Sequence, residues 1–318
     1  MIQFLGRGVA GFALLLVSYI AVGGLMSASG APKARGQMVE IEPGRTLRLV
    51  CEGPRSERPV VWLESGAFGL AADWGAVQEA LTAAGWRSCA YDRAGMGYSP
   101  PGPKPRDGLA IVSDFEKLVV ASGEPGPYIL VGHSMAGLRL REFAGRNPDK
   151  VAGLVLADAA TPEAAQDPRM QGFIKAFANI SRWAARGASL GLYKPLVHTR
   201  LGDKIDLPPA AKAEKGWAFA NGRHNRTAAE EVGLWAEASA QAGQQPPFDP
   251  KWPVAVVTAG PVAGREARKA MQEAPARASE HGLVDHVEDA THTLLIGRRF
   301  ADHIVRAVVF VADARTKG

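Results

Sequence analysis

The sequence predicts an α/β fold built on a mostly parallel sheet. Beyond residue 36, short runs rich in Val, Ile and Leu alternate with amphipathic stretches, which is the order expected when strands and helices alternate along a chain. Gly and Pro cluster at the junctions, as in residues 100–103 and 123–127. The chain has 318 residues, of which 47% are hydrophobic and 22% charged, so it is long enough and apolar enough to bury a core.

Eight short apolar runs are predicted as strands, and the last of them is the weakest. They span residues 38–41, 47–51, 60–64, 87–91, 128–132, 152–157, 254–258 and 285–288. Helical periodicity predicts helices over residues 71–84, 110–122, 135–145 and 300–312.

The segment over residues 161–250 differs from the rest of the chain. It has no clear strand and is rich in Ala, Glu, Gln and Lys. Because so long a stretch is uncommon as a structureless loop in a compact domain, we expect a helical insertion after the sixth strand.

Residues 8–32 carry no charge and are flanked by Arg7 and Lys33. This pattern fits a signal peptide cut within a run of small residues, or a single-span membrane anchor that is retained. A buried helix of the globular domain is the third interpretation. Either of the first two predicts a protein that is exported, and secreted, periplasmic or membrane-anchored. The domain organisation is therefore an export or anchor segment over 1–31 and a folded domain over 32–318 with the insertion 161–250.

Charge and cysteine content exclude several functions. Lys and Arg number 37 against 32 Asp and Glu, and they are scattered, so nothing indicates a nucleic-acid partner. Two cysteines without a C-x-x-C motif cannot supply a zinc or iron–sulfur site alone. No feature of the sequence indicates an oligomeric state.

The segment Gly-His-Ser-Met-Ala-Gly at residues 132–137 lies between the fifth strand and an amphipathic helix. A sharp strand–turn–helix with a serine at its apex is typical of a catalytic nucleophile, and Ser134 holds that position. Such a turn needs small residues two positions before and after the serine, and here these are Gly132 and Ala136. The alternative is that Ser134 merely caps the helix.

With this turn in place, the chain from about residue 38 to 311 resembles the α/β-hydrolase superfamily, in its serine-nucleophile, capped esterase/lipase-like branch. The other matching segments are Leu-Glu-Ser-Gly-Ala-Phe-Gly at 63–69, Tyr-Asp-Arg-Ala-Gly-Met-Gly-Tyr-Ser at 91–99 and Ala-Thr-His at 290–292. The resemblance implies a mostly parallel eight-stranded sheet flanked by helices, with a helical cap inserted after the sixth strand.

The resemblance also implies a catalytic triad with His292 as the base. Asp158, at the end of the sixth strand, is the expected acid, and Glu266 is the alternative because it follows the seventh strand. The backbone N–H groups of Ala67 and Met135 are expected to form the oxyanion hole.

The implied function is cleavage of a small-molecule ester or acyl substrate through an acyl-enzyme, without metal or organic cofactor. Acyl transfer and hydrolysis of amides, lactones or carbon–carbon bonds use the same triad and remain alternatives. A membrane-tethered binding protein that keeps the fold without turnover is a further alternative, because fold does not fix function.

In the superfamily's sheet order, the second strand runs antiparallel beside the fourth. These strands carry Cys51 and Cys89. An exported protein would favour a disulfide between them, and the alternative is two buried thiols.

Overall fold

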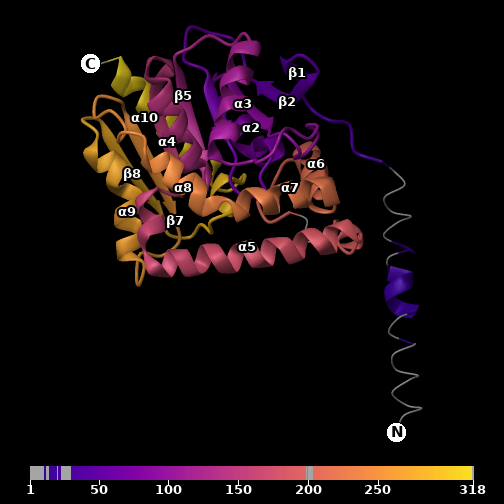
Figure 1. Cartoon of the computed structure of the whole chain (residues 1–318). Coiled ribbons are helices and arrows are strands. Elements are labelled where there is room, and N and C mark those ends of the chain that lie inside the picture. The colour runs from indigo at the N-terminus through magenta and orange to yellow at the C-terminus, as the bar shows by residue number, and fades with distance from the viewer. Residues whose placement is uncertain are drawn as a thin grey trace.

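Eight strands form one sheet in the order β1-β2-β4-β3-β5-β6-β7-β8 (Figure 1). The structure is a computed structural model and describes residues 11, 14–19, 21–22, 30–197, 199 and 203–316. The strands are β1 (Gln37–Glu42), β2 (Arg45–Glu52), β3 (Val61–Glu64), β4 (Ser88–Asp92), β5 (Tyr128–His133), β6 (Val151–Ala157), β7 (Val254–Ala259) and β8 (Gly282–Val287). All eight predicted strands are therefore present.

The sheet is mostly parallel. Only β1 with β2 and β2 with β4 pair antiparallel, and all other neighbours are parallel. Every residue of β5 and β6 is buried, as expected for parallel strands covered on both faces. The carboxyl ends of β5 and β6 consequently lie side by side, and the loops that leave them meet at one edge of the sheet.

Helices cover both faces of the sheet. One hydrophobic cluster includes α2 (Gly75–Ala83) and α10 (Ala301–Arg315), and the opposite cluster includes α3 (Gly108–Ala121) and α4 (Ala136–Arg146). The helix α9 (Glu266–Ala278) was not predicted, because its sequence is polar and contains Pro275.

The segment between β6 and β7 is helical in its described residues. It contains α5 (Pro168–Ser189), α6 (Pro209–Phe219), α7 (Gly222–Gly233) and α8 (Trp235–Gly243), which together cover one end of the sheet as a cap (Figure 1). Short 3-10 turns lie at η1 (Ala71–Trp74), η2 (Pro148–Lys150), η3 (Glu163–Gln166), η4 (Lys194–Leu196) and η5 (Leu294–Ile296).

Two buried ion pairs attach the cap to the sheet domain. Glu214 of α6 accepts from Arg48 of β2 at 2.7 Å. Glu231 of α7 accepts from Arg93, which follows β4, at 2.8 Å. All four side chains are at most 2% exposed, so each charge depends on its partner for stabilisation.

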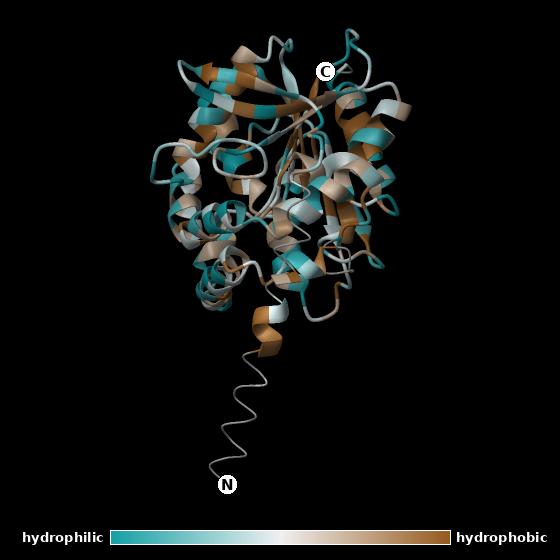
Figure 2. Ribbon diagram, turned by 90° about the vertical axis from the view of Figure 1, so that its right-hand side faces the viewer, coloured by the Kyte–Doolittle hydropathy of each residue, from teal (hydrophilic) through white to brown (hydrophobic). Residues whose placement is uncertain are grey.

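The predicted signal peptide or anchor over residues 1–31 lies mostly outside the described residues and stays a prediction. Its described residues 14–19 form a short hydrophobic helical segment next to the folded body (Figure 2). Within the part of the chain that the structure describes, no helix is both long and apolar enough to span a bilayer.

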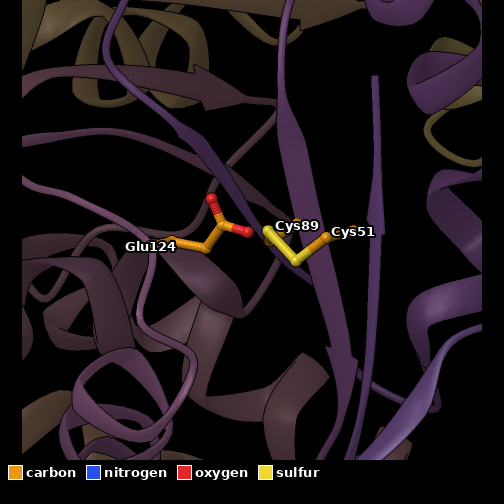
Figure 3. Close-up of side chains that lie close together, drawn as sticks. All are labelled: Cys51, Cys89 and Glu124. Atoms are coloured by element: carbon orange, nitrogen blue, oxygen red, sulfur yellow. A yellow bond between two sulfur atoms is a disulfide. The ribbon is translucent and has the colours of Figure 1, made fainter. Parts of the chain in front are cut away.

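A disulfide joins Cys51 of β2 to Cys89 of β4 (Figure 3). The two residues are direct partners in the antiparallel register, and their Cα atoms are 4.1 Å apart. Glu124 points toward the two sulfur atoms, and the ligand atoms of the three residues lie within 4.8 Å of one another. Because both sulfurs are bonded and the Glu124 carboxylate pairs with Arg87 at 2.6 Å, this cluster offers no free thiolate to a metal.

We expect the double variant Cys51→Ala/Cys89→Ala to lose about 2–4 kcal/mol of unfolding free energy, because the bridge closes a long loop in the unfolded chain. The sequence separation of the two cysteines is 38 residues. Urea denaturation of both proteins, with and without reductant, measures the loss. Equal stability of the wild type in both conditions, or uptake of two alkyl groups without reductant, would contradict the bridge.

Candidate active site

Ser134 occupies a strained turn between β5 and α4. Its φ is 60°, in the left-handed region that costs a non-glycine residue energy. The turn is held by two backbone bonds, from Ser134 N to Ala157 O at 3.2 Å and from Ala160 N to Ser134 O at 2.8 Å. Ser134 therefore sits at the carboxyl edge of the sheet, where a nucleophile is expected.

The glycines around this turn are needed for close packing. A Cβ atom on Gly132 would lie 2.7 Å from Cδ1 of Leu140, and one on Gly137 would lie 2.2 Å from the backbone oxygen of Ala160. The turn accommodates Ala136 at the position where the strict motif has glycine. The displaced glycine at residue 137 is thus required by the close approach of the loop after β6, not by the turn itself.

His292 and Asp158 form a hydrogen-bonded pair. Nδ1 of His292 lies 2.6 Å from Oδ2 of Asp158, although the two residues are separated by 134 positions in sequence. Asp158 directly follows β6 with φ 43°, and its N–H donates to Val257 O at 2.7 Å. This arrangement is the one expected of a triad acid that orients the imidazole of its base.

The surroundings of Asp158 keep it ionised. Burial would raise its pKa, but the hydrogen bond from His292 and nearby positive charge lower the pKa well below its ordinary value. Its other oxygen, Oδ1, accepts from Nε2 of Gln272 at 3.0 Å. The alternative acid, Glu266, is exposed at the start of α9 and accepts from the N–H of Gly264 at 2.9 Å.

Ser134, Asp158 and His292 all line one cavity of about 660 Å³ under the cap. Among the described residues, His292 has no direct hydrogen bond to the Ser134 hydroxyl in this structure. Such bonds are often long or poorly aligned without substrate and tighten in the complex.

His133, next to the nucleophile, supports the other side of His292. Its Nε2 lies 2.8 Å from the backbone oxygen of His292, and the two rings are 4.4 Å apart between centroids. Burial, with His292 nearby, lowers the pKa of His133 to about 3, so this imidazole stays neutral at neutral pH. The position of His133 next to Ser134 in the sequence did not indicate that His133 would contact His292.

A second buried histidine, His224 of α7, also stays neutral. Burial and the charges of Lys215 and Arg93 lower the pKa of His224 to about 3. Its Nδ1 accepts from the N–H of Gly97 at 3.0 Å, which ties the cap to the loop after β4.

These two histidines predict an acid-sensitive fold. Below pH 6.5 the unfolded chain binds protons that buried His133 and His224 do not, so the unfolding free energy should fall as pH drops from 6.5 toward 3. Each contributes up to about 1.4 kcal/mol per pH unit in that window. Urea denaturation between pH 7 and 5 measures the slope, and His224→Gln should make it shallower. An equal slope in both proteins would contradict this origin.

The loop after β3 lies directly against Ser134. A Cβ atom on Gly66 would be 2.7 Å from Cβ of Ser134, so only glycine permits this approach. The next residue, Ala67, lines the cavity, and Met135 precedes α4 on the other side of Ser134. Both residues predicted to supply oxyanion N–H groups therefore flank the serine.

Two arginines, Arg93 and Arg139, hold the loop after β3 through hydrogen bonds. The guanidinium of Arg93 donates to the backbone oxygens of Ser65 and Gly66, both at 2.9 Å. Arg139 of α4 also donates to the Ser65 oxygen and to Glu64 at 2.6 Å. Arg93 lies in the segment 91–99, which contributes to the family resemblance. The sequence did not indicate that its side chain holds the loop after β3.

Lys215 of the cap helix α6 also holds the loop after β3. Nζ of Lys215 donates to the backbone oxygen of Phe68 at 3.0 Å and pairs with Asp73 at 2.8 Å. Phe68 has φ 56°, so three of the four non-glycine residues with positive φ in the described chain, Phe68, Ser134 and Asp158, line the cavity. Strained backbone conformations that cluster in one place are typical of functional sites.

The cavity itself is largely apolar. Beyond Ser134, Asp158 and His292, its wall comes mainly from the cap, with Phe173, Phe177, Trp235, Met170 and Phe219. A concave apolar site with few convergent polar groups suits an organic substrate.

The model of the family described as alpha/beta hydrolase fold matches residues 59–295. "Probable transporter efuK" of Hormonema carpetanum is 36% identical over 130 residues, covering 39% of this chain and 18% of that protein. "Probable esterase PIR7A" of Oryza sativa subsp. indica is 39% identical over 95 residues, covering 29% of this chain and 35% of that protein. The chain thus spans well under two thirds of either relative.

Solved structures share the fold over nearly the whole chain. A thermophilic esterase from Thermogutta terrifontis has a TM-score of 0.61 and 20% identity, and the match covers 88% of this chain and 100% of that one. At this level of identity the likeness shows the fold alone.

Proposed function

Because the chain belongs to the alpha/beta hydrolase fold family, we propose that it is a serine hydrolase that cleaves carboxylic esters. The observation that carries this proposal is the bond of 2.6 Å between His292 and Asp158 at the cavity where Ser134 occupies a strained turn. The apolar wall supports an ester with hydrophobic groups on at least one side of the scissile bond.

In this reaction the Oγ atom of Ser134 attacks the ester carbonyl carbon while His292 takes the hydroxyl proton. The N–H groups of Ala67 and Met135 bind the oxygen as its negative charge develops. The carbonyl re-forms, and the alcohol leaves with the proton from His292. A water then attacks the acyl carbon while His292 takes its proton, the bond between that carbon and Oγ of Ser134 breaks, His292 returns the proton to Oγ, and the acid leaves. Asp158 remains ionised and stabilises the imidazolium.

The test combines covalent labelling with turnover. A fluorophosphonate probe should form an adduct that peptide mass analysis maps to Ser134, and p-nitrophenyl esters of increasing acyl length should be hydrolysed with saturation. A parallel panel of amides and lactones separates ester cleavage from the other reactions of the same triad. Absence of both adduct and turnover would instead favour a binding protein that keeps the fold.

We also propose that the protein acts outside the cytoplasm, either released or held by its N-terminal segment. The uncharged run over residues 8–32 and the disulfide between Cys51 and Cys89 support this placement, since disulfides persist in oxidising compartments. Fractionation of the native host, with N-terminal sequencing of the mature protein, tests both parts.

A further inference from the structure

The outer side of α5 carries an apolar stripe that no described part of the chain covers. α5 is the outermost helix of the cap (Figure 1). Its inner side packs through Ile174 and Ala185, whereas Ile180, Trp183 and, just after the helix, Leu190 are 64%, 67% and 65% exposed. Steps of three and seven residues place these three side chains on one side of the helix surface.

Basic residues follow this stripe. The range 168–190 contains Arg169, Lys175, Arg182 and Arg186 and no acidic residue. The spacing of Lys175, Arg182 and Arg186 places them in one row along the helix. This row lies on the other side of the exposed surface from Ile180. The helix therefore combines an exposed apolar line with a cationic flank, which is the pattern of helices that lie in the plane of a membrane surface.

The cationic flank opens onto a groove of about 1040 Å³ between α5 and α7. Arg182, Arg186 and Arg226 line this groove, and within the described residues none of the three has an acidic partner at ion-pair distance. The acidic side chain of the groove, Glu230, pairs with Lys104 at 2.6 Å. The groove thus presents three guanidinium groups whose described partners are uncharged: Asn179 for Arg182, Ser189 for Arg226 and the Trp183 ring for Arg186. Guanidinium groups suit phosphate oxygens.

The N-terminal segment meets the cap at the end of α5. The Tyr19 hydroxyl donates to the backbone oxygen of Leu192 at 2.9 Å. Near it, Leu14, Leu15 and Val17 are exposed apolar side chains within the uncharged sequence over 8–32. Two apolar surfaces from distant parts of the sequence therefore adjoin at one end of the cap.

We propose that the outer side of α5 docks onto an anionic lipid bilayer. Ile180, Trp183 and Leu190 enter the boundary between headgroups and acyl chains, and Arg182, Arg186 and Arg226 contact lipid phosphates. The proposal does not depend on ester hydrolysis. Since Phe173 and Phe177 of the same helix line the cavity, docking would place the apolar wall of the site next to the membrane.

The test uses residues 30–318, because every buried hydrophobic residue in the described chain lies at Val39 or beyond and this part holds the whole sheet. Co-sedimentation is measured with vesicles of phosphatidylcholine mixed with phosphatidylglycerol and with phosphatidylcholine alone. We expect binding to the anionic vesicles that weakens with salt. Ile180→Glu should weaken it about tenfold or more, and Arg182→Gln/Arg186→Gln about fivefold for each cation removed.

Matched variants sit elsewhere on the surface. Val120→Glu makes the same kind of change at a side chain that is 70% exposed on α3, and Arg299→Gln/Arg315→Gln removes two cations near α10. Both should bind as the wild type does, and all variants should keep their unfolding temperature. Trp183→Phe should retain binding but reduce quenching of tryptophan fluorescence by brominated lipid.

Three results would overturn the proposal. One is equal vesicle binding by Ile180→Glu and Val120→Glu, and another is no preference for anionic over neutral vesicles. The third is a wild type that self-associates in lipid-free sedimentation but ignores vesicles, with Ile180→Glu monomeric, because the stripe would then serve a second copy of the chain.

Discussion

Ser134→Ala is expected to lower kcat/KM for the preferred p-nitrophenyl ester by about 10⁴- to 10⁶-fold, the range seen when a serine nucleophile is removed. No other hydroxyl is expected to replace it, because the strained turn at φ 60° presents this one side chain at the edge of the sheet. Residual activity above the water rate should come from substrate binding and the oxyanion N–H groups.

The variant needs a check that the turn still folds. Alanine at a positive φ keeps the strain of serine and removes only the hydroxyl, so the unfolding temperature should stay close to that of the wild type. Fluorophosphonate labelling should disappear together with turnover. Persistent labelling or turnover in a folded Ser134→Ala protein would remove Ser134 from the mechanism.

Asp158→Asn is expected to lower kcat by about 10⁴-fold while leaving KM similar, because the ground-state contacts of the substrate are unchanged. Both carboxylate oxygens of Asp158 act as acceptors, Oδ2 toward His292 and Oδ1 toward Gln272. An asparagine amide has one acceptor and one donor group, so it must lose one of these bonds or hold the wrong imidazole tautomer. It also lacks the charge that stabilises the imidazolium.

Glu266→Gln is the matched control for the choice of acid. Glu266 is exposed and bonded to the backbone at the start of α9, so its neutral isostere should keep nearly full activity. A large loss in Glu266→Gln with an active Asp158→Asn would assign the acid to α9 and require a rearrangement of the loop after β7.

The central strands of the sheet were predictable because they are buried on both faces. β5 and β6 appear in the sequence as continuous apolar runs, and their ends fix where Ser134 and Asp158 lie. Two neighbouring parallel strands bring their carboxyl ends to one edge, which places Ser134 near Asp158, whereas the roles given to Asp158 and His292 came from the resemblance and stay predictions. β8 was weaker in sequence because it is a partly exposed edge strand, and it starts at Gly282, which pairs with Val254 of β7, rather than at residue 285.

The side chains that hold the loop after β3 were not predictable. Arg93 reaches Ser65 and Gly66 across the sheet edge, and Lys215 reaches Phe68 from a cap helix 147 positions away in sequence. Nothing local marks such partners, because an arginine or lysine on a helix is usually solvated. These contacts could be predicted only from the position of the cap on the sheet. Composition and periodicity do not give that position.

The buried ion pairs between cap and sheet hold the cap in its closed position. Lifting the cap would separate Arg48 from Glu214 and Arg93 from Glu231, while Asp92 and Glu64 of the sheet domain would still pair with the two arginines. The cap carboxylates are therefore the groups that lose their partners when the cap moves. The same two pairs thus fix the shape of the cavity that Ser134, Asp158 and His292 line.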